Sequence, residues 1–232
     1  MKVVILAGGY GTRLSEYTKT IPKPMVKVLG KPIIHRIIDH YVAYGHYEFY
    51  IAIGYKGIEL KKYFLKKRFP QKIKINLIDT GKNTMTGGRL RRLGKYLDET
   101  FLMTYGDGLS NVNLNKLINF HKKNKKIFTL TAVRPPARFG VIKINRNYVN
   151  YFKEKNTLDV GWVNGGFFVI EPEFLRYLKN DQTFLERDPF EKLTKKKELV
   201  AYKHEGFWQC MDTLRDKEIL EKKLKLSFLF KK

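Results

Sequence analysis

The first fourteen residues, MKVVILAGGYGTRL, place three glycines, a threonine and an arginine directly after an apolar stretch. Glycines that follow a strand let backbone N–H groups approach the phosphates of a ligand without obstruction by side chains. Arg13 can bind an oxyanion through two hydrogen bonds. The pattern differs from GxGxxG, because the sixth position from Gly9 is Leu14, and the chain has no GxxxxGK[ST]. The loop therefore predicts polyphosphate binding, with a plain tight turn as the alternative.

A lysine follows this loop in the stretch IPKPM, where Pro22 and Pro24 flank Lys23. Proline has a fixed φ and restricts the residue before it, so such a segment is expected to be stiff and extended. The ammonium group of Lys23 is then presented in a defined direction near the glycine loop. We expect Lys23 to act on a phosphate rather than to be an ordinary surface side chain.

The net charge is the unusual bulk property, since 46 Lys+Arg against 22 Asp+Glu give a formal +24 over 232 residues. Such a balance is typical of nucleic-acid binders and of enzymes that act on anions. The basic residues occur in short runs such as Lys66-Lys67-Arg68 and Lys195-Lys196-Lys197, and the sequence contains no RNP1, KH or zinc-finger pattern. We interpret the runs as solvated faces, with a phosphate-binding patch as the alternative, and expect no nucleic-acid partner.

Few residues suit nucleophilic or zinc chemistry. Cys210 is the single cysteine, so an intramolecular disulfide is excluded and we interpret Cys210 as a small packed side chain. The histidines show no ligand-like spacing: His35, His40, His46, His121 and His204. No apolar run reaches the roughly 18 residues of a membrane span, and the N-terminus lacks the regions of a signal peptide. We therefore expect a cytoplasmic protein with no membrane partner.

Strand-like and helix-like segments alternate up to about residue 134. Apolar runs at 3–7, 49–53, 73–78, 101–105 and 127–133 predict strands, and a helix that Pro32 opens is expected to carry its apolar residues on one face. This alternation predicts a Rossmann-like α/β fold with a doubly wound, mostly parallel sheet. The later runs GVIKI, YVNYF, GGFFVI and LVAYK predict a C-terminal antiparallel elaboration at one edge, before a last helix from 213. Since no linker divides the chain, we expect one domain, 1–232.

The combination of LAGGxGTRL with PKPM resembles the sugar-1-phosphate nucleotidyltransferases. Five further segments are similar to the glucose-1-phosphate cytidylyltransferases in that family: DTGKNTMTGGRL (79–90), FLMTYGDGLSNV (101–112), AVRPPARFG (132–140), VNGGFFVIEP (163–172) and GFWQCMDTLRDK (206–217). Thymidylyltransferases carry a segment of the type QxxPxGLA where TMTGGR stands here. The resemblance implies Mg²⁺-dependent transfer from CTP to a sugar 1-phosphate, with glucose 1-phosphate as the expected acceptor, and assembly into a homo-oligomer.

The resemblance also implies a division of labour, with residues 1–134 binding the nucleotide and residues 135–232 forming the acceptor half and the C-terminal helix. Arg13 and Lys23 are the implied catalytic cations. Thr84 and Arg89 are candidate contacts of cytosine, whose O2 and N3 accept hydrogen bonds. The remaining implied nucleotide-binding residues are Leu6, Ala7, Gly8, Gly9, Gly11, Thr12, Thr104 and Gly106.

Asp107 lies just past the carboxyl end of a predicted strand, where open α/β sheets bind their ligands. The resemblance implies that Asp107 and Asp212 together hold one Mg²⁺. The alternatives are a turn residue for Asp107 and a helix N-cap for Asp212.

On the acceptor side the resemblance points to Lys155, Asn164 and Gly165, and Trp208 is either a core residue or a wall for the sugar. Two other functions stay open: a cytidylyltransferase for another phosphorylated acceptor, and a catalytically inactive nucleotidyltransferase-like binding or regulatory protein. The presence of Arg13, Lys23, Asp107 and Asp212 favours an active enzyme.

Overall fold

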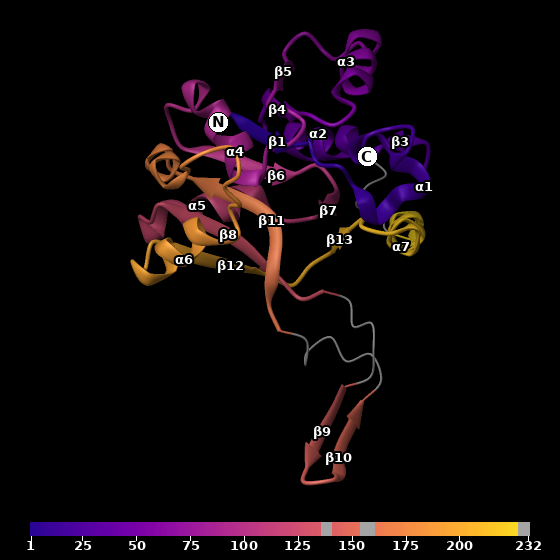
Figure 1. Cartoon of the computed structure of the whole chain (residues 1–232), viewed down its shortest axis with the longest axis vertical. Helices are drawn as coiled ribbons and strands as arrows, with labels where there is room; N and C mark the ends of the chain where they lie inside the picture. Colours follow the sequence, from indigo (N-terminus) through magenta and orange to yellow (C-terminus); the bar gives the residue numbers. More distant parts are fainter. Residues whose placement is uncertain (136–140, 154–160, 227–232) are drawn as a thin grey trace.

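The computed structural model describes residues 1–135, 141–153 and 161–226. In this part of the chain the central sheet has seven strands in the order β12-β8-β11-β6-β1-β4-β5 (Figure 1). β1 (Val3–Leu6) pairs in parallel with β4 (Glu48–Ile53) and β6 (Phe101–Tyr105), and β4 pairs in parallel with β5 (Lys74–Asp79). β8 (Phe128–Val133) and β12 (Leu199–His204) are also parallel. The predicted α/β fold with a mostly parallel sheet is confirmed.

The predicted antiparallel elaboration exists, but its expected place at one edge is wrong. β11 (Val163–Ile170) is antiparallel to both its neighbours and lies between β6 and β8, inside the sheet. Residues 165–170 of β11 are all buried, and a strand that is apolar on both faces needs an interior position. The edge strand β12 is parallel to β8, whereas β9 (Val141–Asn145) and β10 (Tyr148–Lys153) form a separate hairpin that extends away from the body (Figure 1).

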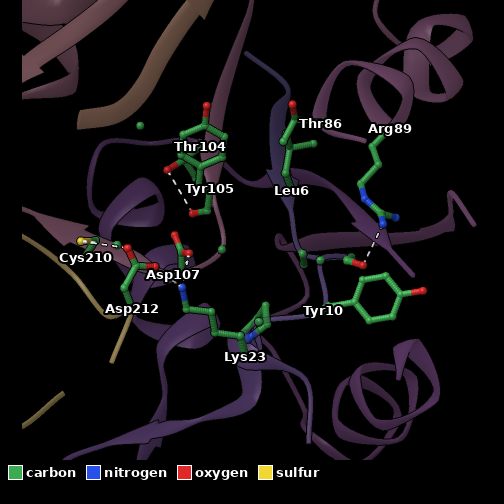
Figure 2. Close-up of a pocket in the computed structure, with 18 of the residues that line it drawn as sticks. Leu6, Tyr10, Lys23, Thr86, Arg89, Thr104, Tyr105, Asp107, Cys210 and Asp212 are labelled. Atoms are coloured by element: carbon green, nitrogen blue, oxygen red, sulfur yellow. Dashed lines mark hydrogen bonds and ion pairs between the residues drawn. The ribbon is translucent and has the colours of Figure 1, made fainter. Parts of the chain in front are cut away.

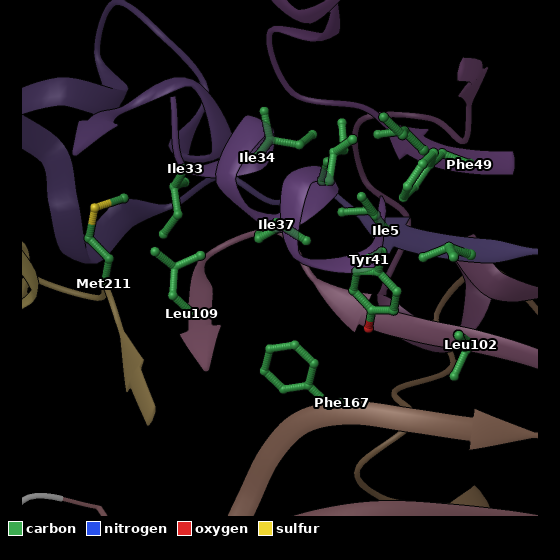
Figure 3. Packing of buried hydrophobic residues seen from close by; sticks show 14 of the residues in the cluster. Ile5, Ile33, Ile34, Ile37, Tyr41, Phe49, Leu102, Leu109, Phe167 and Met211 are labelled. Atoms are coloured by element: carbon green, nitrogen blue, oxygen red, sulfur yellow. The ribbon is translucent and has the colours of Figure 1, made fainter. Parts of the chain in front are cut away.

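Helices cover both faces of the sheet, and the alternation of side chains along β1 divides the core into two clusters. Val3 and Ile5 belong to one cluster, to which α2 (Ile33–Ala43), α5 (Leu114–Asn124) and α7 (Leu214–Leu226) contribute. Val4 and Leu6 belong to the other, with α4 (Thr86–Leu93) and α6 (Asp188–Lys195). Figure 3 shows the buried face of α2 packed against the strands. The helix that Pro32 opens thus has the predicted apolar face.

Further helices and strands of the described residues are α1 (Ser15–Thr18), α3 (Gly57–Lys66), β2 (Lys27–Val28) and β3 (Lys31–Pro32). β7 (Gly108–Ser110) and β13 (Trp208–Cys210) form a small antiparallel pair beyond the end of β6. None of the described helices is long and apolar enough to cross a membrane.

Candidate functional site

A pocket of about 550 Å³ lies at the carboxyl ends of β1 and β6. The predicted site residues within the described part of the chain all line it: Leu6, Ala7, Gly8, Gly9, Gly11, Thr12, Arg13, Lys23, Thr84, Arg89, Thr104, Gly106, Asp107, Asn164, Gly165 and Asp212. Lys155 lies outside the described residues. Two parts of the sequence, before residue 108 and after residue 163, therefore form a single cavity.

The glycine loop connects β1 to a 3₁₀ turn at Thr12–Leu14. Gly11 has φ 64°, in the left-handed region, and a Cβ there would lie 2.9 Å from Thr18 Cγ2 and 3.0 Å from Lys23 Cβ. Glycine is therefore required both by the backbone conformation and by close packing on Lys23. A Cβ on Gly9 would meet nothing within 4 Å, so the backbone of Gly9 lies open at the pocket.

Lys23 lies at the base of the pocket with only 10% of its side chain exposed. Its Nζ is 2.7 Å from Asp107 Oδ2 and 2.6 Å from Asp212 Oδ1 (Figure 2). Pro22 is extended as predicted, but Lys23–Met25 forms a 3₁₀ turn rather than a continuation of the extended segment. Burial lowers the pKa of Lys23, and the negative charges of Asp107 and Asp212 outweigh this effect, so that the net pKa is raised. Lys23 is a cation at neutral pH.

The pairing of β7 with β13 brings the two carboxylates together. Gly108 pairs with Cys210, and the N–H of Met211 donates to the carbonyl of Asp107 over 2.8 Å. Asp107 and Asp212 thus leave adjacent strand ends on the same side of the pocket. Arg13 Nη1 lies 2.8 Å from the second oxygen of Asp212, so both predicted catalytic cations contact that carboxylate.

The alternative role of Asp212 as a helix cap is wrong, because Thr213 is the N-cap of α7 and Asp216, in the first turn, is its partner. The Asp216 carboxylate accepts hydrogen bonds from the backbone N–H groups of Asp212 and Thr213. In return, the N–H of Asp216 donates to the hydroxyl of Thr213. This reciprocal cap leaves the side chain of Asp212 free to face the pocket.

The two carboxylates suit a shared divalent cation. Their oxygens already converge on one ammonium nitrogen, and carboxylate oxygens are the ligands that Mg²⁺ prefers. In the described residues no group of three or more His, Cys, Asp or Glu side chains gathers into a metal site. A cation held here would therefore complete its coordination with oxygens from the substrate or from water.

Arg89 of α4 is buried and lines the pocket beside the glycine loop. Its Nη1 donates to Thr80 Oγ1 and the carbonyl of Gly81, and its Nη2 donates to the carbonyls of Gly8 and Lys82. Both terminal nitrogens therefore have protein acceptors, and a direct contact with the base stays a prediction. Arg89 ties the glycine loop to the segment after β5. The buried Thr84 lies in the wall that this contact supports.

The first residues of β11 and Trp208 form another wall of the pocket. Asn164 Oδ1 accepts a hydrogen bond of 2.9 Å from the N–H of Gly166. Trp208 Nε1 donates to the carbonyl of Gly165 over 2.7 Å, and the indole lines the pocket. Trp208 thus packs against the hydrophobic core and also lines the pocket, so it has features of both interpretations.

Several lining residues were not identified from the sequence. Tyr10 lies in the glycine loop, and its hydroxyl donates to Asn83 Oδ1 over 2.5 Å. Tyr105 directly precedes Gly106, and Thr86 begins α4. Tyr10 and Tyr105 belong to the motifs that predicted the site, and each lies next to a glycine. This position beside a glycine could have indicated from the sequence that both line the pocket.

Cys210 is unsuited to nucleophilic chemistry. Burial, and then the charges of Asp212 and Asp107, raise the pKa of its thiol to about 12. The Sγ lies 3.9 Å from Asp212 Oδ2. The thiol is therefore protonated at neutral pH. The side chain itself is half-buried and lines the pocket.

Comparisons with a family model, with curated proteins and with solved structures all match this chain to nucleotidyl transferases or to their fold. Residues 2–216 match the family described as Nucleotidyl transferase. The chain is 44% identical over 243 residues to the glucose-1-phosphate cytidylyltransferase of Salmonella typhimurium, with 95% of each chain covered. It is 30% identical over 229 residues to the mannose-1-phosphate guanyltransferase of Hypocrea jecorina, covering 95% of this chain and 62% of that protein. The structure of HddC from Yersinia pseudotuberculosis matches with a TM-score of 0.77 at 24% identity, over 96% of this chain and 99% of that one, and this likeness concerns the fold alone.

Proposed function

The chain belongs to the nucleotidyl transferase family. We propose that it is a cytidylyltransferase that joins CTP and a sugar 1-phosphate, with glucose 1-phosphate as the acceptor. The products are the CDP-sugar and pyrophosphate. The observation that carries the proposal is the convergence of Arg13, Lys23, Asp107 and Asp212 beside an open glycine loop. Identity of 44% with a glucose-1-phosphate cytidylyltransferase supports the choice of base and sugar.

The reaction is an in-line displacement at the α-phosphorus of the triphosphate. A phosphate oxygen of the acceptor forms the new P–O bond, and the bond to the bridging oxygen of the β-phosphate breaks as pyrophosphate leaves. The attacking oxygen is already anionic, so no general base is required. The difficulty is the repulsion between two anions, which positioned cations relieve. The protonated thiol of Cys210 and the five histidines have no role in this scheme.

Each part of the pocket then has a defined task. The backbone of the glycine loop, with Thr12, binds the triphosphate, and Arg13 and Lys23 neutralise the charge that develops on the transferred and leaving groups. In this role Lys23 exchanges its contacts with Asp107 and Asp212 for contacts with phosphate oxygens. Asp107 and Asp212 would hold one Mg²⁺, which when bound neutralises charge on the α-phosphate.

The base and the acceptor lie on different walls. Thr84 and the backbone groups of the segment that Arg89 supports face cytosine, while Leu6, Ala7, Thr104 and Gly106 form the floor on the nucleotide side. Asn164 and Gly165 face the sugar. Lys155 is assigned to the acceptor phosphate by resemblance alone, since it lies outside the described residues. We propose the same division of the chain as before, with residues 1–134 as the nucleotide half and residues 135–232 as the acceptor half.

The test is pyrophosphate release with CTP, dTTP, UTP, ATP and GTP, each with Mg²⁺ and a panel of phosphorylated acceptors. Release with CTP and glucose 1-phosphate is the expected result. Release with CTP and another acceptor would retain the base assignment and change the sugar. Absence of release with every pair, from a folded protein, would instead support an inactive binding or regulatory protein.

Two further expectations belong to this proposal. The family resemblance implies a homo-oligomer, which light scattering of the purified chain measures directly. A location in the cytoplasm, expected from the sequence, is also part of the proposal, and fractionation of the source cells tests it.

A further inference from the structure

Tyr105 takes part in a hydrogen-bonded chain that reaches from the acceptor wall to the nucleotide wall. Its hydroxyl donates to Glu186 Oε1 over 2.5 Å, and Glu186 Oε2 accepts from Thr86 Oγ1 over 2.8 Å. Thr86 Oγ1 in turn accepts from the N–H of Leu185 over 3.0 Å. Figure 2 shows Tyr105 and Thr86 on the side of the pocket away from Lys23. The proposed reaction chemistry does not use these residues.

The same hydroxyl also reaches the acceptor residue Asn164. Asn164 Nδ2 lies 3.4 Å from the hydroxyl of Tyr105, and Asn164 Oδ1 accepts from the N–H of Gly166. A side-chain amide has two N–H donors and two lone pairs on its oxygen. The contacts with Tyr105 and Gly166 use one of each and fix which end of the amide carries the nitrogen. One donor and one acceptor therefore remain for a ligand, a combination that suits a hydroxyl group.

Packing holds the ring of Tyr105 in place. Gly166 has φ 78°, and a Cβ there would lie 2.6 Å from Tyr105 Cδ2, so only glycine admits the ring at this point. On its other side the ring meets Phe168 edge-on, with centroids 5.4 Å apart. Burial, and then the charge of Glu186, raise the pKa of Tyr105. The hydroxyl thus keeps its proton and remains a donor to Glu186.

We propose that Tyr105 is a positioning residue for the acceptor: held by Glu186, it orients the Asn164 amide to bind one hydroxyl of the sugar, and Glu186 links this orientation to Thr86 on the nucleotide wall. The inference rests on the proposed function and assigns the sugar discrimination to this chain of contacts. Because the hydroxyl of Tyr105 touches no reacting atom, its loss affects acceptor binding more than nucleotide binding.

The test compares Tyr105→Phe with Tyr50→Phe. Tyr50 is a matched control, since its hydroxyl donates to Glu48 over 2.8 Å on β4, and neither residue lines the pocket. Tyr105→Phe is expected to raise KM for glucose 1-phosphate about three- to tenfold, because the Asn164 amide loses the hydroxyl that orients it, with KM for CTP unchanged. Tyr50→Phe should leave both KM values unchanged. Glu186→Gln, at an exposed position, should shift KM in the same direction and serves as the second variant if Tyr105→Phe does not fold.

Deoxy analogues of glucose 1-phosphate identify the hydroxyl. With the wild type, the analogue that lacks the bound hydroxyl should have a lower kcat/KM than the other analogues. In Tyr105→Phe this difference in kcat/KM should be smaller, because the two changes weaken the same contact and their effects are therefore not additive. Equal rises in both KM values, or no change in either, would overturn the inference while leaving the proposed function intact. No turnover by the wild type with any sugar phosphate would overturn both.

Discussion

The ammonium nitrogen of Lys23 lies 2.6 Å from a carboxylate oxygen of Asp212, although 189 residues separate the two in the sequence. The same nitrogen lies 2.7 Å from Asp107, so one lysine holds two carboxylates together at the base of the pocket. Two carboxylates without a cation between them would repel each other. The contact therefore keeps the site assembled before substrate binds, and the partners can be exchanged when phosphates and a metal ion arrive.

Replacement of this lysine should abolish most of the activity. Lys23→Ala is expected to lower kcat/KM on the order of a hundredfold or more, because a charge aimed at the transferred phosphate is lost. Pyrophosphate release measures the effect, and Lys27→Ala, at an exposed lysine four residues later, is the control. If the folded Lys23→Ala variant lost less than about threefold, Lys23 would have no place in the mechanism.

The carboxylates should govern the metal requirement. Asp107→Asn and Asp212→Asn are each expected to raise the Mg²⁺ concentration for half-maximal activity by about tenfold or more, since a neutral amide is a weaker ligand than a carboxylate. Activity at a series of Mg²⁺ concentrations measures this shift. Asp98→Asn, at a surface ion pair with Lys2, should leave the titration unchanged. An unaltered titration for Asp107→Asn or Asp212→Asn would show that this residue is not a ligand.

The cap of α7 should stabilise the fold. Asp216→Ala removes the acceptor for the backbone N–H groups of Asp212 and Thr213, and is expected to lower the free energy of unfolding by about 1 kcal/mol. Urea denaturation measures this change. Asp216→Asn, which keeps one acceptor oxygen, should lose less. If Asp216→Ala were as stable as the wild type, the reciprocal cap would not contribute to stability.

The thiol of Cys210 should be slow to react in the folded protein. Its pKa of about 12, against an ordinary value of 9.0, leaves about a thousandth of the thiol as thiolate at pH 9, whereas the unfolded chain is half ionised. Iodoacetamide should therefore label the protein in urea on the order of a hundredfold faster than the native protein. Mass spectrometry of the labelled chain follows both rates.

The raised pKa of Cys210 also makes the free energy of unfolding depend on pH. Since the folded state binds the thiol proton more tightly than the unfolded state, this contribution is fully present below pH 9 and is lost as the pH rises toward 12. Cys210→Ser should keep near-normal turnover. Loss of all activity in a folded Cys210→Ser variant, or equal labelling rates in native and unfolded protein, would contradict this account.

Many residues of the candidate site could be predicted from the sequence, because the patterns that indicate them involve only neighbouring residues. A glycine loop after a buried strand, a lysine between two prolines and an aspartate at a strand end each report the backbone within a few residues. The alternation of strands and helices determined the parallel sheet for the same reason. These local features were enough to place Gly9, Lys23 and Asp107 at one end of the sheet.

Only the tertiary structure decided which distant groups meet. β11 lies in the interior of the sheet and not at its edge. The pairing of β13 with β7 places Asp212 beside Asp107. The acceptors of Arg89 lie in the glycine loop and in the segment after β5. Glu186 reached Tyr105 from 81 residues away. The physical reason is that many strand orders and buried hydrogen-bond pairings are compatible with the same local pattern. The one that forms depends on contacts between residues far apart in the sequence, which local periodicity does not report.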